Sequence, residues 1–267
     1  MTAQQLLVLC YAFALLRYPV HYVALAYLVM LALGPLVFWL KVRLSVPEWE
    51  ISTATDLAAL PAEVKPLFAS SDGALADLGF AVVCLLRDPN LFAGRVVWSA
   101  MYLNRSTVEK AMVAAVLPRT GRPAADALVS FTTGFSDGRS IETNNRRELN
   151  PLPPLPGTSP WQFPNVADAR RLYRIHQLRA EPLGTARRQF PAPGAEIQAF
   201  TTALCKTYED YATLGYLRAI EPKRYRPTVI GAILGFFRLA APGKWLLQVQ
   251  RALRNRSFLA AHPIGDT

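Results

Sequence analysis

Residues 22–40 of this 267-residue chain contain no charged side chain, and most of them are apolar. A helix rises about 1.5 Å per residue, so a helical run of this length covers roughly the hydrocarbon thickness of a bilayer. Only a helix satisfies all of its own backbone hydrogen bonds in that environment. The run therefore predicts a transmembrane helix that holds the rest of the chain beside a membrane.

A second apolar run, residues 5–16, lies upstream, and a short segment that includes Arg17 and Pro19 separates the two. The second run is short for a span, so we expect a short or partly inserted helix that could form a hairpin with the first. A secretory signal peptide is the alternative. However, no Lys or Arg precedes the run, and its small-residue triplet, Ala12-Phe13-Ala14, lies inside the apolar stretch.

The charges beside the predicted span indicate its orientation. Lys41 and Arg43 follow it directly, while Arg17 precedes it and reduces the asymmetry. The positive-inside rule places the downstream chain in the cytoplasm, on the inner membrane of the cell. We expect three parts: a membrane anchor over residues 1–43, an α+β domain over residues 44–222 and a basic amphipathic segment over residues 223–260.

The net charge of +10 is concentrated near the end of the chain. Eight cations and no acid lie between Pro222 and Gly265: Lys223, Arg224, Arg226, Arg238, Lys244, Arg251, Arg254 and Arg256. Apolar residues alternate with them, and Pro242-Gly243 divides the stretch. This pattern predicts one or two amphipathic helices that lie in the membrane interface and contact anionic lipid. Alternatively, the apolar faces pack on the domain or on the N-terminal helix while the arginines face water.

Composition also bears on partners and cofactors. Nucleic acid is the rival polyanion, but the sequence contains no nucleic-acid-binding module, so we expect no nucleic-acid partner. Cys10, Cys84 and Cys205 are isolated in apolar surroundings. They predict buried thiols in a reducing compartment, without a disulfide framework, a metal site or a cofactor.

Short apolar runs divided by polar turns fill the middle of the chain. They lie at residues 44–52, 80–86, 96–103, 110–117, 127–135 and 140–143. This pattern predicts an antiparallel meander of five or six strands, the first of which leaves the membrane. Asp137-Gly138 marks the last hairpin, because an Asp-Gly pair favours a tight turn with positive φ at both central positions.

Helical patterns flank these strands. Residues 61–77 predict a helix interrupted at Ser70-Ser71-Asp72-Gly73, which is turn-like. Helices over residues 166–179, capped at or near Asn165, and 194–217, ending near Gly215, should cover one face of the sheet. The fold class predicted is therefore α+β.

Residues 149–164 contain six prolines and cannot form a regular helix or a central strand. We expect an extended connector with Leu and Trp anchors. A ligand for an SH3-type domain is the alternative, because of the Pro-Leu-Pro-Pro-Leu-Pro core.

Several of these motifs occur in one order: the hairpin stretch 131–145, the proline-rich crossing, Leu172-Tyr173 followed by His176, and the basic apolar end 226–242. Together they resemble a pattern of uncharacterised bacterial membrane-anchored proteins, over most of residues 60–250. The resemblance implies the architecture described above and carries no activity and no site.

Four polar residues are candidates for chemistry: Asp137, Asn144, Asn145 and His176. Asp137 could be a general acid or a metal ligand, but turn geometry explains its place before Gly138. The two asparagines could bind a polar ligand or cap a strand end. On its apolar helical face, His176 could be a catalytic base or a hydrogen-bonded core residue. The sequence contains no phosphate-binding loop, nucleophile elbow or metal-binding His pair.

Two functions are consistent with these features. The first is a non-enzymatic scaffold or accessory subunit of a membrane assembly, whose cytoplasmic domain contacts a protein partner and whose basic helices contact anionic lipid. The second is a membrane-bound enzyme for a lipid-linked or small polar substrate, which requires a pocket beside His176, Asn144 and Asn145.

Overall fold

The computed structural model describes residues 22, 24–52, 57, 60–92, 95–118, 127–183, 188–189 and 191–264. The predicted second apolar helix, residues 5–16, lies outside the described residues.

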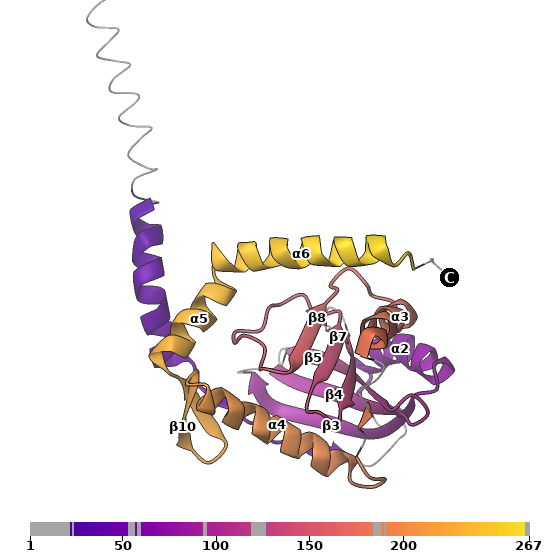
Figure 1. Cartoon of the computed structure of the whole chain (residues 1–267). Coiled ribbons are helices and arrows are strands. Elements are labelled where there is room, and N and C mark those ends of the chain that lie inside the picture. The colour runs from indigo at the N-terminus through magenta and orange to yellow at the C-terminus, as the bar shows by residue number, and fades with distance from the viewer. Residues whose placement is uncertain are drawn as a thin grey trace, which may run out of the picture.

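The chain adopts an α+β fold around a mostly antiparallel sheet of eight strands (Figure 1). These are β2 (Glu50–Ser52), β3 (Ala81–Phe92), β4 (Arg95–Asn104), β5 (Glu109–Pro118), β6 (Leu128–Phe135), β7 (Ser140–Asn144), β8 (Thr158–Gln162) and β9 (Arg188–Gln189). Strands β3 to β7 pair in sequence order and confirm the predicted meander. The sheet exceeds five or six strands because β2 and β8 extend its edges and β9 pairs with β6.

The hairpin between β6 and β7 forms at Asp137-Gly138 as predicted, but its turn is wider. The N–H of Phe135 donates to the carbonyl of Arg139 at 2.9 Å, which leaves a three-residue loop. Gly138 has φ of 82°, whereas Asp137 is not among the residues with positive φ. The prediction of positive φ at both positions is therefore wrong. The loop instead matches a turn that closes with one left-handed glycine.

The proline-rich connector ends in a strand that the sequence pattern does not predict. Strand β8 pairs parallel with β7, and Ser159 lies opposite Ile141. Pro160 is tolerated because β8 is an edge strand, which needs ladder hydrogen bonds on one side only.

Helices cover both faces of the sheet, whereas the prediction placed two on one face. They are α2 (Lys65–Asp77), α3 (Ala169–Ala180), a short 3-10 helix (Glu181–Leu183) and α4 (Glu196–Thr213). The main core contains Leu85, Phe131 and residues of α2 and α3. Helix α4 packs Ile197 and Phe200 against the opposite face, near Leu86. Successive strand residues point to opposite faces, so β3 supplies both cores.

Helix α2 is continuous, although Ser70-Ser71-Asp72-Gly73 predicts an interruption. Ser71 is buried, and Asp72 accepts a hydrogen bond from the Tyr102 hydroxyl at 3.2 Å. Tertiary contacts therefore hold this turn-like sequence in a helix.

The ends of α3 and α4 follow recognisable capping rules. Helix α3 begins after Asp168, whose side chain accepts a hydrogen bond from the N–H of Arg170, and not after Asn165. Helix α4 ends just before Gly215, as predicted, where φ is 76°. The N–H of Tyr216 then donates to the carbonyl of Tyr211, which is a glycine-based helix stop.

A second, three-stranded sheet lies at the base of the N-terminal helix. Its order is β1 (Leu44–Ser45), β11 (Arg224–Pro227) and β10 (Leu217–Glu221). The single strand predicted over residues 44–52 is thus two strands in two sheets. Arg224 and Arg226 lie in a hairpin strand and Lys223 in its turn, not in an amphipathic helix.

Three further helices lie outside the two sheets (Figure 1). They are the N-terminal helix Ala24–Lys41, α5 (Val229–Leu239) and α6 (Gly243–Ala261). The break at Pro242-Gly243 is confirmed, and α5 and α6 meet at 63°. Figure 1 shows the N-terminal helix leaving the domain, α5 beside its base and α6 running across the domain.

Candidate membrane-facing surface

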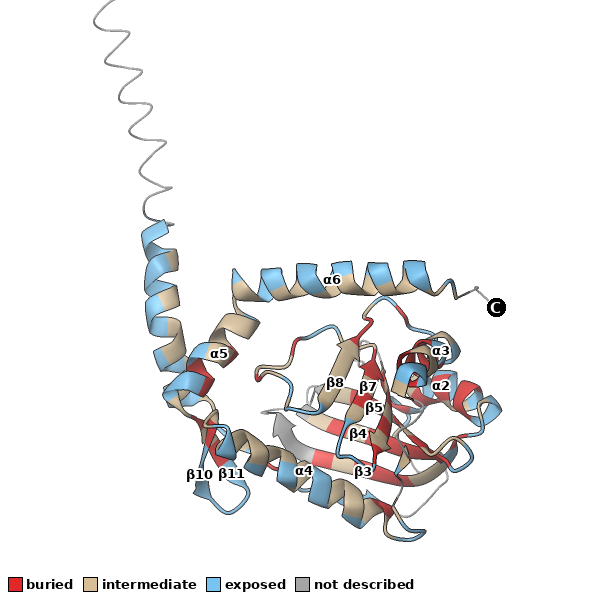
Figure 2. Cartoon of the chain, viewed as in Figure 1, coloured by how far each residue is buried: buried red, intermediate tan, exposed pale blue. Residues whose placement is uncertain are grey.

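No described residue of the N-terminal helix is buried, and most of them are exposed (Figure 2). In the stretch Ala24–Lys41, 0% of the residues are buried inside the structure. Leu25, Leu28, Leu33, Val37 and Leu40 are among its exposed large side chains. Its length and hydropathy suffice for a membrane span, a property that signal sequences and core helices share. The absence of burial distinguishes it from a helix in a soluble core.

Helix α5 packs closely against the N-terminal helix through glycines. A Cβ at Gly34 would lie 2.2 Å from the Phe236 ring, and one at Gly235 would lie 2.8 Å from Phe38. Close approach at small residues is a recurrent way to pack helices in membranes. Beside this contact the two helices enclose an apolar groove of about 420 Å³.

Helix α6 turns polar side chains toward the domain. Arg251 donates to the Gln162 side-chain oxygen at 2.8 Å, and Asn255 donates to the Gln162 carbonyl at 2.6 Å. The Arg254 guanidinium lies over Trp161, 4.2 Å from the ring centroid. These contacts attach α6 to β8.

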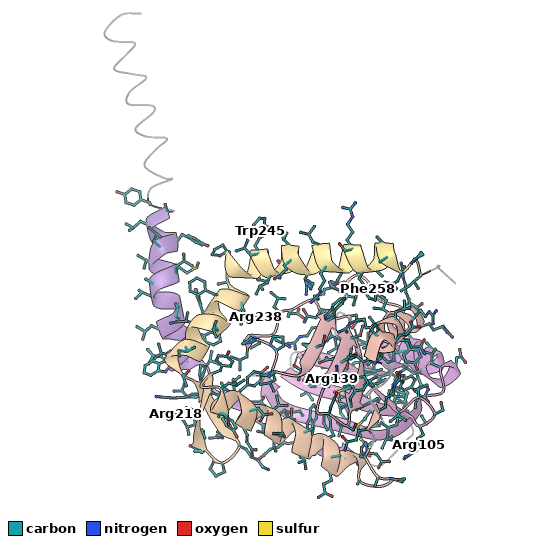
Figure 3. All side chains as sticks on the ribbon, viewed as in Figure 1. Arg105, Arg139, Arg218, Arg238, Trp245 and Phe258 are labelled. Atoms are coloured by element: carbon teal, nitrogen blue, oxygen red, sulfur yellow. The ribbon has the colours of Figure 1, made fainter. Side chains whose placement is uncertain are left out.

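The opposite side of α6 is apolar and exposed. It carries Trp245, Leu246, Val249 and Leu253, and both Trp245 and Leu253 are 61% exposed. Figure 3 shows Trp245 and Phe258 on opposite sides of the helix, and Phe258 packs against Trp161. A surface helix of a soluble protein has the reverse polarity, with its apolar side toward the core.

The eight predicted lipid-contact cations fall into two groups. Six contact other parts of the chain: Lys223 lies 3.8 Å from Glu48, Arg224 lies 2.9 Å from Glu221, Arg226 stacks on Trp39, Arg238 donates to the Asn150 carbonyl, and Arg251 and Arg254 bind β8. Lys244 and Arg256 are exposed on α6. Of the eight, only the last two are both exposed and located on the amphipathic helix α6.

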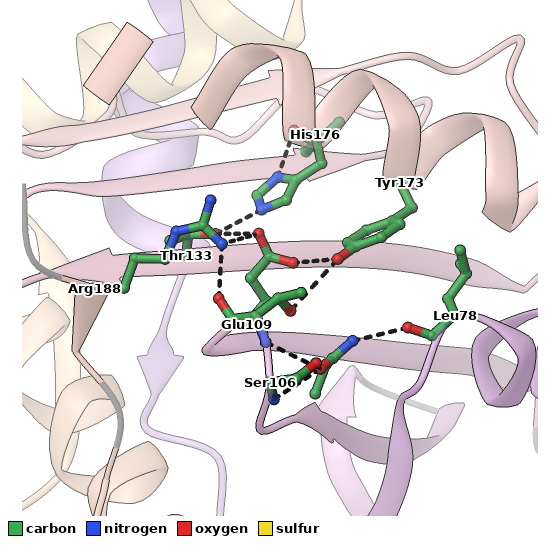
Figure 4. Close-up of polar contacts among 10 residues, drawn as sticks. Leu78, Ser106, Glu109, Thr133, Tyr173, His176 and Arg188 are labelled. Carbon is green, nitrogen blue, oxygen red and sulfur yellow. Dashed lines mark hydrogen bonds and ion pairs between the residues drawn. The ribbon is translucent and has the colours of Figure 1, made fainter. Parts of the chain in front are cut away.

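His176 lies in a buried polar network between α3 and the sheet (Figure 4). It is 0% exposed; its Nε2 lies 2.8 Å from the Thr133 hydroxyl and its Nδ1 lies 3.0 Å from the Thr143 hydroxyl. Burial lowers the pKa of His176 to about 3, and the charges of Arg179 and Arg188 act in the same direction. The ring is therefore neutral at physiological pH, hydrogen-bonded at both nitrogens and without access to solvent.

Glu109 is the buried acid at the centre of this network. Its carboxylate accepts hydrogen bonds from Tyr173 at 2.5 Å and from Arg188 at 2.8 Å. Burial raises the pKa of Tyr173, and its hydrogen bond to Glu109 adds to this. The charges of Glu109 and Arg188 are paired with each other, and the hydrogen bonds of this cluster connect α3, β5 and β9.

Arg179 joins the core of the domain to α6. Its guanidinium donates to the Thr143 hydroxyl at 2.7 Å and to the Ser159 carbonyl at 2.7 Å. It also lies over Trp161, 4.4 Å from the centroid, so Trp161 contacts both Arg179 and Arg254. The sequence pattern predicts Trp161 only as a packing anchor of the proline-rich connector. It does not identify Arg179 or Glu109, because their partners are remote in the chain.

The other candidate residues form local contacts. Asp137 accepts hydrogen bonds from the backbone N–H and the guanidinium of Arg139, and these interactions hold the pKa of Asp137 below its usual value. Asn144 donates to the Glu142 carboxylate at 2.7 Å. Asn145 accepts a hydrogen bond from the N–H of Val129 at 2.8 Å. These are the turn and capping roles named as alternatives above.

The structure does not bring the four candidates into one cleft. Asp137 lies in the β6–β7 loop, and Thr143, which contacts His176, points to the opposite face from Asn144. The two pockets found near the N-terminal helix do not include His176. Among the described residues, no group of His, Cys, Asp and Glu could hold a metal ion.

Comparison with protein-family models, curated proteins and solved structures found no match for this chain. The resemblance to bacterial membrane-anchored proteins therefore stays a prediction from the sequence.

Proposed function

We propose that this chain is a membrane-anchored, non-enzymatic scaffold or accessory subunit. The N-terminal helix crosses the inner membrane, and the α+β domain lies on its cytoplasmic side, where it meets a protein partner. Helix α6 lies in the membrane interface with its apolar side toward lipid and its exposed cations, Lys244 and Arg256, near anionic headgroups.

The observation that carries this proposal is the orientation of α6, whose exposed side is largely apolar. Arg251 and Arg254 bind the domain, whereas Trp245, Leu246, Val249 and Leu253 are exposed on the side that faces away from it. Exposing Trp245, Leu246 and Leu253 to water would cost about 25 cal/mol per Å² of apolar surface. Lipid contact removes this cost, as it does for the N-terminal helix beside it.

The enzyme alternative receives no support from the network around His176. The ring is buried, both its nitrogens are hydrogen-bonded, and a pKa of about 3 makes it a weak base near neutral pH. A general base must reach the proton that it removes, directly or through one water.

Accessibility of α6 in liposomes tests the proposal. A nitroxide attached at Leu253→Cys in the full-length protein should be accessible to dissolved oxygen and shielded from an aqueous nickel chelate. The matched position is Lys206→Cys, an exposed position on α4, which should show the reverse. Cys10 and Cys205 are replaced by Ser beforehand. Cys84 can stay, because burial raises its thiol pKa to about 11 and suppresses the reactive thiolate.

Equal exposure of the two labels to the nickel chelate would contradict an interfacial α6. Extraction of the unlabelled full chain by alkaline carbonate would contradict the membrane span.

A further inference from the structure

Three arginines form a row across the small sheet. Arg226 on β11 lies opposite Arg218 on β10. The register Leu44 to Tyr225, continued by one residue, places Arg43 on the other side of Arg226. Directly opposed residues share a face, with Cβ atoms about 4.5–5.5 Å apart, and like charges there destabilise a sheet. The row therefore holds a concentrated positive charge at the base of the N-terminal helix.

No acid compensates this charge in the part of the chain that the structure describes. Arg226 lies over Trp39, 4.9 Å from the ring centroid, and Arg43 donates to the carbonyl of Val42 at 2.9 Å. By contrast, Arg224, two residues from Arg226 on the same strand, pairs with Glu221 at 2.9 Å. The three arginines thus remain available to a ligand anion.

The apolar groove begins where this row ends. Trp39 lines the groove together with Pro35, Leu36, Val229 and Ile233. The Arg226 guanidinium lies over the indole ring of the same Trp39. The groove volume of about 420 Å³ lies within the range of small-molecule sites. An apolar channel with cations at one end is complementary to an amphiphile with an anionic head.

We propose that this site binds one anionic phospholipid, with an acyl chain in the groove and its phosphate at Arg226, Arg218 and Arg43. The proposal rests on the membrane attachment proposed above and deepens it. It replaces a general attraction to anionic lipid by a defined site. Arginine suits this role because its planar guanidinium donates two parallel hydrogen bonds to phosphate oxygens.

The position of the site also bears on how the chain lies in the membrane. Figure 1 shows α6 beginning to one side of the N-terminal helix, above the junction of that helix with the small sheet, and running away from it across the domain. A bilayer that meets α6 and supplies a headgroup to the arginine row therefore crosses the helix at a tilt. Spans tilt by about 20° on average and by up to about 40°, so a tilted crossing is not unusual.

Native mass spectrometry of the full-length protein in neutral detergent tests the site. Phosphatidylglycerol and phosphatidylcholine with identical chains are added in equal amounts. The wild type should retain one phosphatidylglycerol in preference to phosphatidylcholine. Arg226→Gln should lower phosphatidylglycerol retention about fivefold, the value expected for one basic residue near a headgroup. Ile233→Trp, which fills the groove from an exposed position, should lower retention of both lipids.

Arg224→Gln is the matched control, because it removes the same charge from the same strand but from a residue already paired with Glu221. It should leave retention unchanged. Equal retention of the two lipids by the wild type, or an equal loss in Arg224→Gln and Arg226→Gln, would overturn the site. Displacement of the lipid by glycerol phosphate, which has no chain, would overturn the role of the groove. Carbonate extraction of the same protein reports membrane attachment separately, so the two proposals can fail independently.

Discussion

At the residue scale, His176 connects α3 to two strands of the sheet. Thr133 on β6 and Thr143 on β7 each bind one ring nitrogen. The geometry fits a neutral ring protonated at Nε2, because Thr143 also accepts a hydrogen bond from Arg179 and can donate only to Nδ1. A second proton would leave Nδ1 and the Thr143 hydroxyl with opposing donors.

This arrangement predicts a loss of stability in mild acid. The pKa of His176 falls from 6.5 in a model peptide to about 3 in the fold. Between these values the unfolded state binds a proton that the folded state does not, so stability falls as the pH falls. From about pH 7.5 to about pH 5, the wild type should lose about 2 kcal/mol more than His176→Gln. Chemical denaturation of the full-length protein in detergent measures this difference.

His262→Gln is the control for that experiment, since His262 is only partly buried near the end of α6. It should keep the pH dependence of the wild type. Parallel stability profiles for the wild type and His176→Gln would show that His176 does not stay neutral in the fold.

The sequence predicts the residue scale only where partners are close in the chain. The turn role of Asp137 follows from the sequence because its partner, Arg139, is two residues away. The sequence does not predict the role of Glu109, because Tyr173 and Arg188 reach it only after the chain has folded. His176 was recognisable as polar on an apolar helical face, but its two threonine partners were not.

At the scale of elements, glycines in two helices should respond oppositely to the same substitution. A Cβ at Gly231 in α5 would lie 1.9 Å from the carbonyl oxygen of Tyr216, which is backbone and cannot move aside. A Cβ at Gly73 in α2 meets nothing within 4 Å. We expect Gly231→Ala to destabilise by at least about 2 kcal/mol. Gly73→Ala should stabilise by about 0.5–1 kcal/mol, through the better helix propensity of alanine.

Thermal unfolding of the two variants and the wild type in one detergent measures these effects. A Gly231→Ala protein as stable as the wild type would mean that α5 does not pack on the chain around Tyr216 as described.

The attachment of α6 gives a second prediction at this scale. Arg254→Gln removes the cation from Trp161, an interaction that contributes about 1 kcal/mol when partly desolvated. Amide hydrogen exchange in residues 244–261 should then become about fivefold faster, while exchange in the sheet stays unchanged. Mass spectrometry of peptic peptides measures both regions.

Arg256→Gln is the matched control, because Arg256 lies on the same helix and is exposed. Equal acceleration in the two variants would mean that net charge, and not the contact with Trp161, sets the stability of α6.

Elements were predictable where the pattern is local and repetitive. The meander, the α5–α6 break and the end of α4 at Gly215 follow from apolar runs and from glycine and proline positions. The faces that helices cover were not predictable: Leu85 and Leu86 are alike in sequence yet face α3 and α4 respectively. Pairing of β1 with β11 joins residues about 180 positions apart, a contact that a local pattern cannot encode.

At the scale of the whole molecule, the N-terminal helix should determine membrane retention. Val29 and Leu33 are exposed near the middle of the helix. Replacing both with Arg should cost about 2.5–3.5 kcal/mol each in a membrane span. The double variant should therefore move from the membrane pellet to the supernatant in alkaline carbonate, whereas the wild type stays in the pellet.

Leu214→Arg is the control, because Leu214 is an exposed leucine at the end of α4. It should stay with the membrane, as the wild type does. Retention of the Val29→Arg, Leu33→Arg protein in carbonate would show that another part of the chain anchors it.

Only Val42 and Arg43 separate the N-terminal helix from β1. The close packing of Phe38 on Gly235 and of Trp39 beneath Arg226 fixes that junction further. The domain consequently cannot swivel about the N-terminal helix as it would on a flexible tether. With that helix in a bilayer, as proposed above, a protein partner would reach the domain along one fixed direction relative to the membrane.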